Sequence, residues 1–275
     1  MWFFNNKPLG IAIFSMTLAI LFFSIIPASA TTVISLDNTV DTPDRTVTYQ
    51  DKNYELQDVG AYLIGEPVNI SVNVTDINSF QLSLLDMKED FLWNNMVYYT
   101  GGKAEMIMPA YVVTIPGTYI YAVFYQGDMV AFKPVVFSQN KITISPDRTT
   151  VAPGGSLHIK VKVIPDTSMP VKVVLAKDSS SLEYPVNRTH EGSYETEIKL
   201  PMSAYGRFSL YGAIVSENKV MGTDEFMGIS NAGTINITDI PQSGLPSKSG
   251  DYSLLTILFV FLAGLLLLVF RKGKS

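Results

Sequence analysis

Three aspartates close together are the nearest approach to a metal-binding motif in the sequence. Asp37, Asp41 and Asp44 lie within eight residues, and clustered carboxylates can hold Ca²⁺. Their spacing matches neither an EF-hand nor a repeat-type calcium loop. A solvated acidic segment is therefore favoured over a calcium site, and neither a metal nor a cofactor is predicted.

Two histidines are the remaining candidates for acid–base chemistry. His158 occupies a polar position in a segment of alternating residues, and His190 lies in a predicted loop. A general base requires a nucleophile within hydrogen-bonding reach, and the sequence suggests none near either histidine. The nucleophile-elbow, zinc-protease and phosphate-loop motifs are absent, and the chain has no cysteine. We therefore predict that the protein is not an enzyme.

A dense aromatic stretch could instead serve binding. Phe91, Trp93, Tyr98 and Tyr99 lie within nine residues, and exposed rings stack on sugars or pack against other proteins. The alternative is that these rings fill a core. Core filling is favoured because Trp93 aligns with Tyr184 in a second copy of the sequence pattern described below. These four aromatic residues are nevertheless the candidate binding patch.

Four asparagines carry the N-x-Ser/Thr acceptor motif for N-glycosylation, which is used on exported proteins. They are Asn69, Asn73, Asn187 and Asn236. Asn69 and Asn73 fall on the polar side of an alternating segment, from which a glycan would project into solvent. Unmodified polar strand residues are an equally open alternative.

Short strands are the elements expected to position these residues. Val68–Val74 and Leu157–Val163 alternate apolar and polar side chains, which indicates strands with one face against a core. Glycine and proline recur between such runs. No amphipathic helix stands out before the C-terminal apolar segment.

The strand pattern occurs twice in the same order. The matched segments are Thr42–Thr46 with Ser145–Thr149, Gly65–Val74 with Gly154–Val163, Phe80–Asp86 with Val171–Lys177, Met106–Pro109 with Ile198–Pro201, and Gly117–Ala122 with Gly206–Tyr211. The first copy has an extra stretch, Tyr49–Ile64. Two β-sandwich domains in series are therefore predicted, over residues 31–138 and 139–239, and the fold class is all-β.

The chain ends with a predicted membrane anchor. Leu254–Phe270 contains 17 uncharged residues, which span about 26 Å as a helix, close to the thickness of a bilayer core. We predict a transmembrane helix over 253–270 and a cytoplasmic tail over 271–275, because the tail is rich in lysine and arginine. A buried core helix is the alternative reading.

The chain begins with a predicted secretory signal, residues 1–30. Lys7 precedes an apolar run, and Ala28-Ser29-Ala30 fits a cleavage site. The apolar run is long, so an uncleaved N-terminal anchor is the alternative. All 25 acidic residues lie between the signal and the anchor. This acidic exterior argues against a nucleic-acid partner.

A linker is predicted between the second sandwich and the anchor. Residues 240–252 are rich in Pro, Ser and Gly and lack alternation, so they form a flexible or extended stalk. Within the stalk, Leu245–Gly250 resembles a sortase-type sorting signal, but it lacks the threonine and has an inserted residue. A retained membrane helix is favoured over processing by a sorting enzyme.

Two motifs carry a family resemblance. Val151–Val161 resembles the Pro-Gly entry to the second strand of prokaryotic immunoglobulin-like and fibronectin-like surface modules, and Ile115–Tyr121 resembles their tyrosine-corner strand. The layout of the whole chain is similar to that of archaeal cell-surface proteins, especially those of methanogens. The resemblance implies two tandem immunoglobulin-like domains on a C-terminal membrane anchor.

The expected function is structural or adhesive. We expect a single-pass cell-membrane protein with most of its mass outside the cell, which contacts the membrane and other surface or envelope proteins or glycans. The alternative is a membrane-tethered receptor or accessory subunit that binds a polysaccharide or small ligand through domain 1. The extra stretch Tyr49–Ile64, with Tyr54, Tyr62 and Leu63, is the expected place for a special binding surface.

Overall fold

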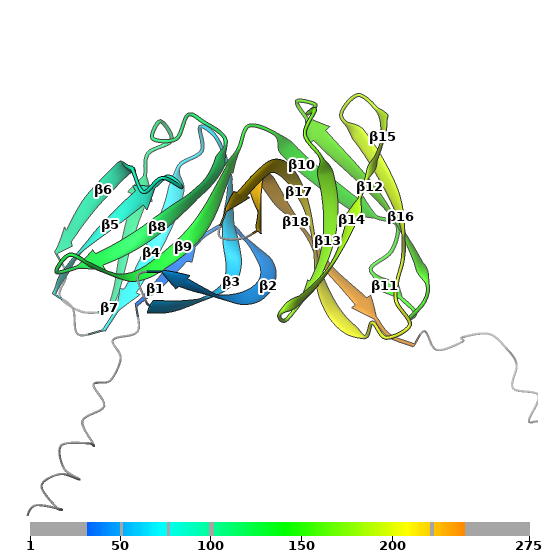
Figure 1. Cartoon of the computed structure of the whole chain (residues 1–275), viewed down its shortest axis with the longest axis horizontal. Coiled ribbons are helices and arrows are strands. Elements are labelled where there is room, and N and C mark those ends of the chain that lie inside the picture. Colours follow the sequence, from blue (N-terminus) through cyan, green and yellow to red (C-terminus); the bar gives the residue numbers. More distant parts are fainter. Residues whose placement is uncertain (1–31, 50–51, 76–77, 99–101, 221–222, 240–275) are drawn as a thin grey trace, which may run out of the picture. The chain divides into compact units, whose positions relative to one another are not determined.

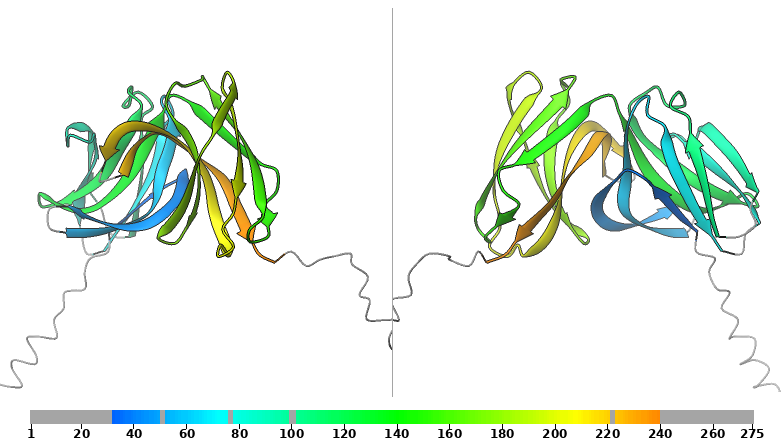
Figure 2. Two further views of the ribbon diagram at one scale, coloured as in Figure 1. Left: turned by 45° about the vertical axis from the view of Figure 1, so that its right-hand side comes forward. Right: turned by 180° about the vertical axis from the view of Figure 1, so that it is seen from behind.

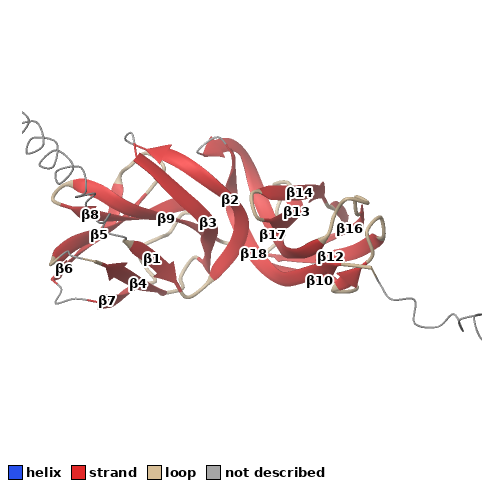
Figure 3. Cartoon of the chain, turned by 90° about the horizontal axis from the view of Figure 1, so that it is seen from below, coloured by secondary structure: helices blue, strands red, loops and turns tan. Residues whose placement is uncertain are grey.

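The computed structural model describes residues 32–49, 52–75, 78–98, 102–220 and 223–239. Every regular element in these ranges is a β-strand, so the prediction of an all-β fold is confirmed (Figure 3). In the described part of the chain, no helix is long and apolar enough to cross a membrane. The predicted signal (1–30), stalk (240–252), membrane helix (253–270) and tail (271–275) lie outside the described residues.

The described residues up to Thr238 belong to one compact unit, which contains eighteen strands (Figure 1). The first nine are β1 (Val33–Leu36), β2 (Thr39–Tyr49), β3 (Lys52–Leu63), β4 (Val68–Val74), β5 (Ser79–Leu85), β6 (Phe91–Tyr98), β7 (Gly102–Met108), β8 (Gly117–Tyr125) and β9 (Asp128–Ser138). The others are β10 (Lys141–Pro146), β11 (Thr150–Val151), β12 (Ser156–Ile164), β13 (Val171–Lys177), β14 (Ser180–Pro185), β15 (Asn187–His190), β16 (Ser193–Lys199), β17 (Gly206–Val220) and β18 (Thr223–Ile237).

Strands β1–β9 form two sheets that share one hydrophobic core. One sheet has the order β1-β4-β7 and the other has the order β2-β3-β9-β8-β5-β6. The alternation in β4 produces its two faces, because its four valine and isoleucine side chains are buried while Asn69 and Asn73 are exposed. Phe80, Tyr121 and Phe137 from the larger sheet fill the same core. We call this pair of sheets the first sandwich.

Strands β10–β18 form a second pair of sheets with its own core. Their orders are β10-β12-β16-β15 and β11-β18-β17-β13-β14. Leu157, Ile159, Val161 and Val163 of β12 point into this core, as the alternation of their segment predicts. We call this pair the second sandwich.

The two sandwiches correspond strand for strand, apart from one insertion and the added edge strand β15. The sequence matches between β4 and β12, β5 and β13, and β8 and β17 agree with the strand orders. The match of Thr42–Thr46 with Ser145–Thr149 is wrong, because Thr42–Thr46 lies inside β2 whereas Pro146 ends β10. Leu36 pairs with Ile70 and Pro146 pairs with Ile159. The structural equivalent of Asp147 is therefore Asp37.

The insertion is a long hairpin, β2–β3, that occupies the place of the two-residue strand β11. The end of β3, Gly60–Leu63, pairs in parallel with β9, as β11 pairs with β18. The remainder of the hairpin covers the outer face of the larger sheet, where Tyr54 and Leu56 pack with Phe132 and Ala122. The predicted extra stretch Tyr49–Ile64 is thus only the second half of the inserted hairpin.

A separate hydrophobic cluster joins the two sandwiches, and we call it the junction cluster. Its buried members are Val40, Val59, Ala61 and Val136 from the first sandwich and Val174, Ala176, Tyr211, Ala213, Val215 and Ile229 from the second. The β17–β18 hairpin contacts β8 and β9, and Thr118 Oγ1 donates to the Phe226 carbonyl at 3.0 Å. Figure 2 shows this hairpin beside β2 and β3 from two sides.

Candidate functional site

Strand β6 is the most exposed apolar strand of the described chain. It forms one edge of the six-stranded sheet and pairs only with β5. Its eight residues include no charged residue and no proline, two of the devices that protect a sheet edge. Every other described edge strand either has four residues or fewer, or carries a charge or a proline. The one irregularity in its pairing with β5 lies at the start of the strand, between Phe91 and Trp93. The rest of β6 is a regular edge without charge or proline, which can accept a further strand.

The candidate binding patch divides between the two faces of β6. Trp93 pairs with Leu84 and packs, partly buried, against the core of the first sandwich. Phe91 and Tyr98 remain 56% and 84% exposed. Tyr99 lies outside the described residues. The structure therefore brings Trp93 to the core side and leaves Phe91 and Tyr98 available for contact.

A groove adjoins the outer face of β6. Its volume is about 650 Å³, and its lining includes Phe91 and Met96 from β6, Phe124 from β8, and the carboxamides of Gln81 and Gln126. The centroids of the Phe91 and Phe124 rings lie 5.9 Å apart. Aromatic faces beside uncharged hydrogen-bonding groups suit a neutral ligand or an apolar peptide side chain.

The part of this groove that comes from β8 was not predicted from the sequence. The alternation Tyr119, Tyr121, Val123 assigns these residues to the core, and all three are buried. Ile120, Ala122 and Phe124 on the other face break the alternation, and Phe124 is only partly buried. Apolar residues at these three positions, which alternation expects to be polar, were the available signal for a second apolar face.

The tyrosines of the inserted hairpin have structural roles. The Tyr62 hydroxyl is buried and donates to Asp37 at 2.6 Å, and burial together with this bond raises the pKa of Tyr62. The Tyr54 ring packs at a tilt against Phe132 with 4.7 Å between ring centroids, and its hydroxyl donates to the Met129 carbonyl. The expected special binding surface is therefore not formed by these two rings.

The three aspartates considered for calcium do not converge. Asp37 accepts hydrogen bonds from Tyr62 and from Asn69 Nδ2; partial burial opposes its ionisation, but these bonds outweigh burial and lower its pKa. Asp41 accepts a bond from Ser209 Oγ at 3.1 Å instead. No group of three acidic, histidine or cysteine side chains in the described ranges could hold a metal ion.

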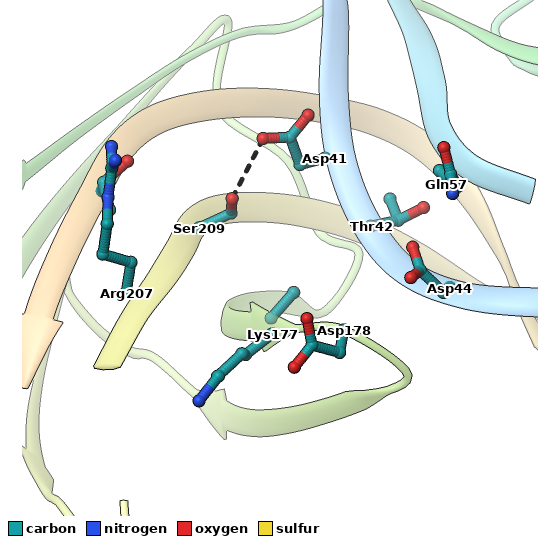
Figure 4. A pocket seen from close by; sticks show the side chains of 10 residues that line it. Asp41, Thr42, Asp44, Gln57, Lys177, Asp178, Arg207 and Ser209 are labelled. Carbon is teal, nitrogen blue, oxygen red and sulfur yellow. Dashed lines mark hydrogen bonds between the residues drawn. The ribbon is translucent and has the colours of Figure 1, made fainter. Parts of the chain in front are cut away.

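Asp41 and Asp44 line a polar groove of about 530 Å³ between β2 and the second sandwich (Figure 4). Asp178, Lys177 and Arg207 contribute from the other side. The Lys177 ammonium is held by the Tyr205 carbonyl at 2.8 Å, and the Asp44 backbone N–H donates to the Asp178 carbonyl at 2.7 Å. Hydrogen bonds from the Asp44 backbone to Asp178 and from Ser209 to Asp41 join the two sandwiches along this groove.

The two histidines lie on the second sandwich. The backbone N–H of His158 donates to Asp147, and its ring faces Glu195 with 3.7 Å between Nε2 and Oε2. His190 is exposed at the end of β15 rather than in the predicted loop. No serine or threonine hydroxyl bonds either imidazole among the described contacts.

All four sequon asparagines are exposed on strands. Asn69 and Asn73 lie on the outer face of β4, Asn187 begins the edge strand β15, and Asn236 pairs with Arg207 near the end of β18. The Asn69 carboxamide donates to Asp37 at 2.6 Å. Modification at each site stays a prediction.

Comparisons with known proteins give only distant structural likenesses. No family model matches the sequence, and no curated protein matches it. A tetra-tandem repeat in the extending region of a large adhesion protein is 12% identical over 75% of this chain and 49% of its own, with a TM-score of 0.26. The native conformation of Escherichia coli alpha-2-macroglobulin is 11% identical over 78% of this chain and 15% of its own, with a TM-score of 0.25. This chain thus spans about half or less of either structure, and at these TM-scores neither assigns it a function.

Proposed function

We propose that this chain is a non-catalytic, membrane-anchored protein of the cell surface with a structural or adhesive role, and that β6 is its contact surface. The observation that carries the proposal is the uncharged, exposed edge strand Phe91–Tyr98 beside an aromatic groove. Soluble proteins rarely leave such an edge uncovered unless it serves association. The partners would be other surface or envelope proteins or glycans.

Both sandwiches are proposed to be immunoglobulin-like. The support is their strand order, in which the last strand pairs in parallel with an early strand, β9 with β3 and β18 with β11. A tyrosine corner is further support, since the Tyr119 hydroxyl donates to the Ile115 carbonyl at 2.7 Å. The second sandwich has Phe208 at the matching position and cannot form this bond.

The anchoring of the chain is the second part of the proposal, and it rests on the sequence alone. Mass spectrometry of the intact protein from its membrane tests it. We expect an N-terminus at Thr31, a C-terminus at Ser275 and added hexose mass on some of the four sequon asparagines. An N-terminus at Met1 would mean two anchors, and a C-terminus within Leu245–Gly250 would mean transfer by a sorting enzyme.

An adhesion assay tests the proposed contact surface. Beads that carry the Tyr98→Ser variant should attach to cells that display the protein with at least about tenfold lower affinity, because tyrosines are enriched among the hot-spot residues whose loss costs about 2 kcal/mol or more. Tyr111→Ser is the matched control, since Tyr111 is 80% exposed and lies outside β6. Equal attachment of both variants would remove β6 from the proposal.

The alternative function is a tethered receptor or accessory subunit that binds a polysaccharide or a small ligand. The groove beside β6 favours it, because Phe124 and Gln81 offer a ring and a carboxamide to a neutral sugar. Titration with neutral oligosaccharides, followed by Trp93 fluorescence, tests this reading. Binding that is lost in Phe124→Ala and kept in Tyr98→Ser would favour the receptor over the adhesive role.

A further inference from the structure

The free side of β6 is a template for another strand. Backbone N–H and C=O groups alternate along the outer side of any edge strand, and an added strand satisfies them as it extends the sheet. Asn94 and Asn95 lie at the middle of β6, with apolar residues on both sides of them. An extended segment whose middle is polar and whose ends are apolar would match β6 along its length.

We propose that this segment is β6 of a second copy of the chain, paired antiparallel about a twofold axis. The proposal rests on the contact surface proposed above and names its partner. The distribution of charge is consistent with this occupant. The chain has a net charge of −5, so two copies repel each other wherever acidic residues meet. The eight residues of β6 contribute no charge, so two copies can approach along this strand.

The pleat fixes the register of the pair. Residues directly opposite in an antiparallel pair share a face of the sheet. Residues on the same face of one strand are an even number of positions apart. In a twofold pair the axis must therefore pass through one residue position, where that residue lies opposite the same residue of the second copy. Placing Asn95 on the axis sets Trp93 opposite Val97 of the second copy and Leu92 opposite its Tyr98. One step to either side sets Trp93 or Val97 opposite an asparagine, so among these three registers Trp93 and Val97 meet each other only when Asn95 is central.

The side chains of β5 and β6 show which layers this register would join. Trp93 and Val97 pair with Leu84 and Phe80 and pack against the core of the first sandwich. Opposed across the axis, they would extend that core into the second copy. Asn95 suits the axis because a carboxamide both donates and accepts, so two of them can bond each other. The result is one continuous sheet built from two six-stranded sheets.

The absence of cysteine makes a direct test available. The full chain in its membrane would carry either Asn95→Cys or, as the matched control, Thr143→Cys on the exposed edge strand β10. Opposed residues of an antiparallel pair have Cα atoms about 5 Å apart, which a disulfide can bridge. Under a mild oxidant, Asn95→Cys should form a covalent dimer at least about tenfold faster than Thr143→Cys. Equal rates, or no dimer from Asn95→Cys, would overturn the proposal.

A charge on the axis gives the second measurement. Asn95→Lys places two ammonium groups opposite each other on a surface strand, where like charges destabilise the pair. Mass photometry of the full chain in detergent should find dimers of the unmodified protein and monomers of this variant, with unchanged circular dichroism. A dimer that persists in Asn95→Lys would overturn the proposal.

Failure of the homodimer can be distinguished from failure of the proposed function. If the unmodified chain is monomeric and Tyr98→Ser still reduces attachment, β6 binds a strand of a different surface protein and only the homodimer is overturned. If attachment is also unaffected, the adhesive role of β6 is overturned too.

Discussion

Ile229 in the junction cluster offers a test of whether the two sandwiches unfold together. Its side chain is 6% exposed on β18 of the second sandwich, in one cluster with Val136 of the first. Ile229→Ala removes about three methylene-sized groups at about 0.8 kcal/mol each. The cavity left behind adds to this, so the free energy of unfolding should fall by about 3 kcal/mol.

The assay uses a tryptophan in the other sandwich. The chain has two tryptophans, Trp2 and Trp93, so a Trp2→Phe background leaves Trp93 as a reporter of the first sandwich. If the junction couples the sandwiches, Ile229→Ala should lower the urea midpoint of Trp93 fluorescence by about 1 M, given a slope of about 3 kcal/mol/M. Circular dichroism should shift by the same amount.

A substitution of an exposed residue in the first sandwich serves as the control. Val33→Ala changes a side chain that is 52% exposed, and it should leave the midpoint within error. If Ile229→Ala shifts circular dichroism but leaves the Trp93 midpoint in place, the sandwiches unfold independently. The junction cluster would then contribute little to the stability of the first sandwich.

Two further substitutions test local contacts. Asp37→Asn removes the carboxylate charge that accepts hydrogen bonds from Tyr62 and Asn69. Folding lowers the pKa of Asp37. The stability that this carboxylate contributes is therefore present near pH 7 and is lost as the pH falls below about 4. The free energy of unfolding of the variant should be lower at pH 7 by under about 1 kcal/mol. Between pH 7 and pH 3 its urea midpoint should fall less than that of the parent protein, because the variant has no carboxylate at position 37 to protonate. Gly228→Ala would place a Cβ 2.5 Å from Ser138 Oγ, so the thermal midpoint should fall by several degrees, from a cost of about 1–3 kcal/mol; an unchanged midpoint would show that Ser138 can move away.

The sequence predicted the strands because their alternation is local. In β4 and β12 every second residue is apolar, and the burial of each follows that pattern. Short identities were less reliable guides. Pro-Asp-Arg-Thr occurs in both copies, yet Pro43 lies within a hairpin and Pro146 ends a first strand. Pairing register, which depends on partners distant in sequence, decides that Asp37 is the equivalent of Asp147.

The junction cluster was not predicted, although a signal for it was present. Val173–Ala176 and Val135–Phe137 are unbroken apolar runs, and both faces of their strands are buried. One sandwich core accounts for one face only, so such runs indicate a second covering layer. Alternation cannot say which element supplies that layer, because the contact between β13 and β2 joins residues far apart in the chain.

The binding patch was predicted as a group and is divided by the pleat. Trp93 and Tyr98 differ by an odd number of positions, so they lie on opposite faces of β6 once the strand is recognised. Its position at the edge of the sheet could not be read from the sequence. Edge position depends on whether another strand pairs with the far side of β6, and that is a property of the whole fold.

The short connection between the sandwiches limits how the gene can be rearranged. Only Gln139 and Asn140 separate β9 from β10. Asn140 is held there, because its backbone N–H donates to Ser138 Oγ and its carboxamide donates to the Pro165 carbonyl. A protease would find little free backbone between the halves, and a recombination event that moved one half alone would expose Val136 or Ile229 to water. We expect the two sandwiches to be gained, lost and duplicated together.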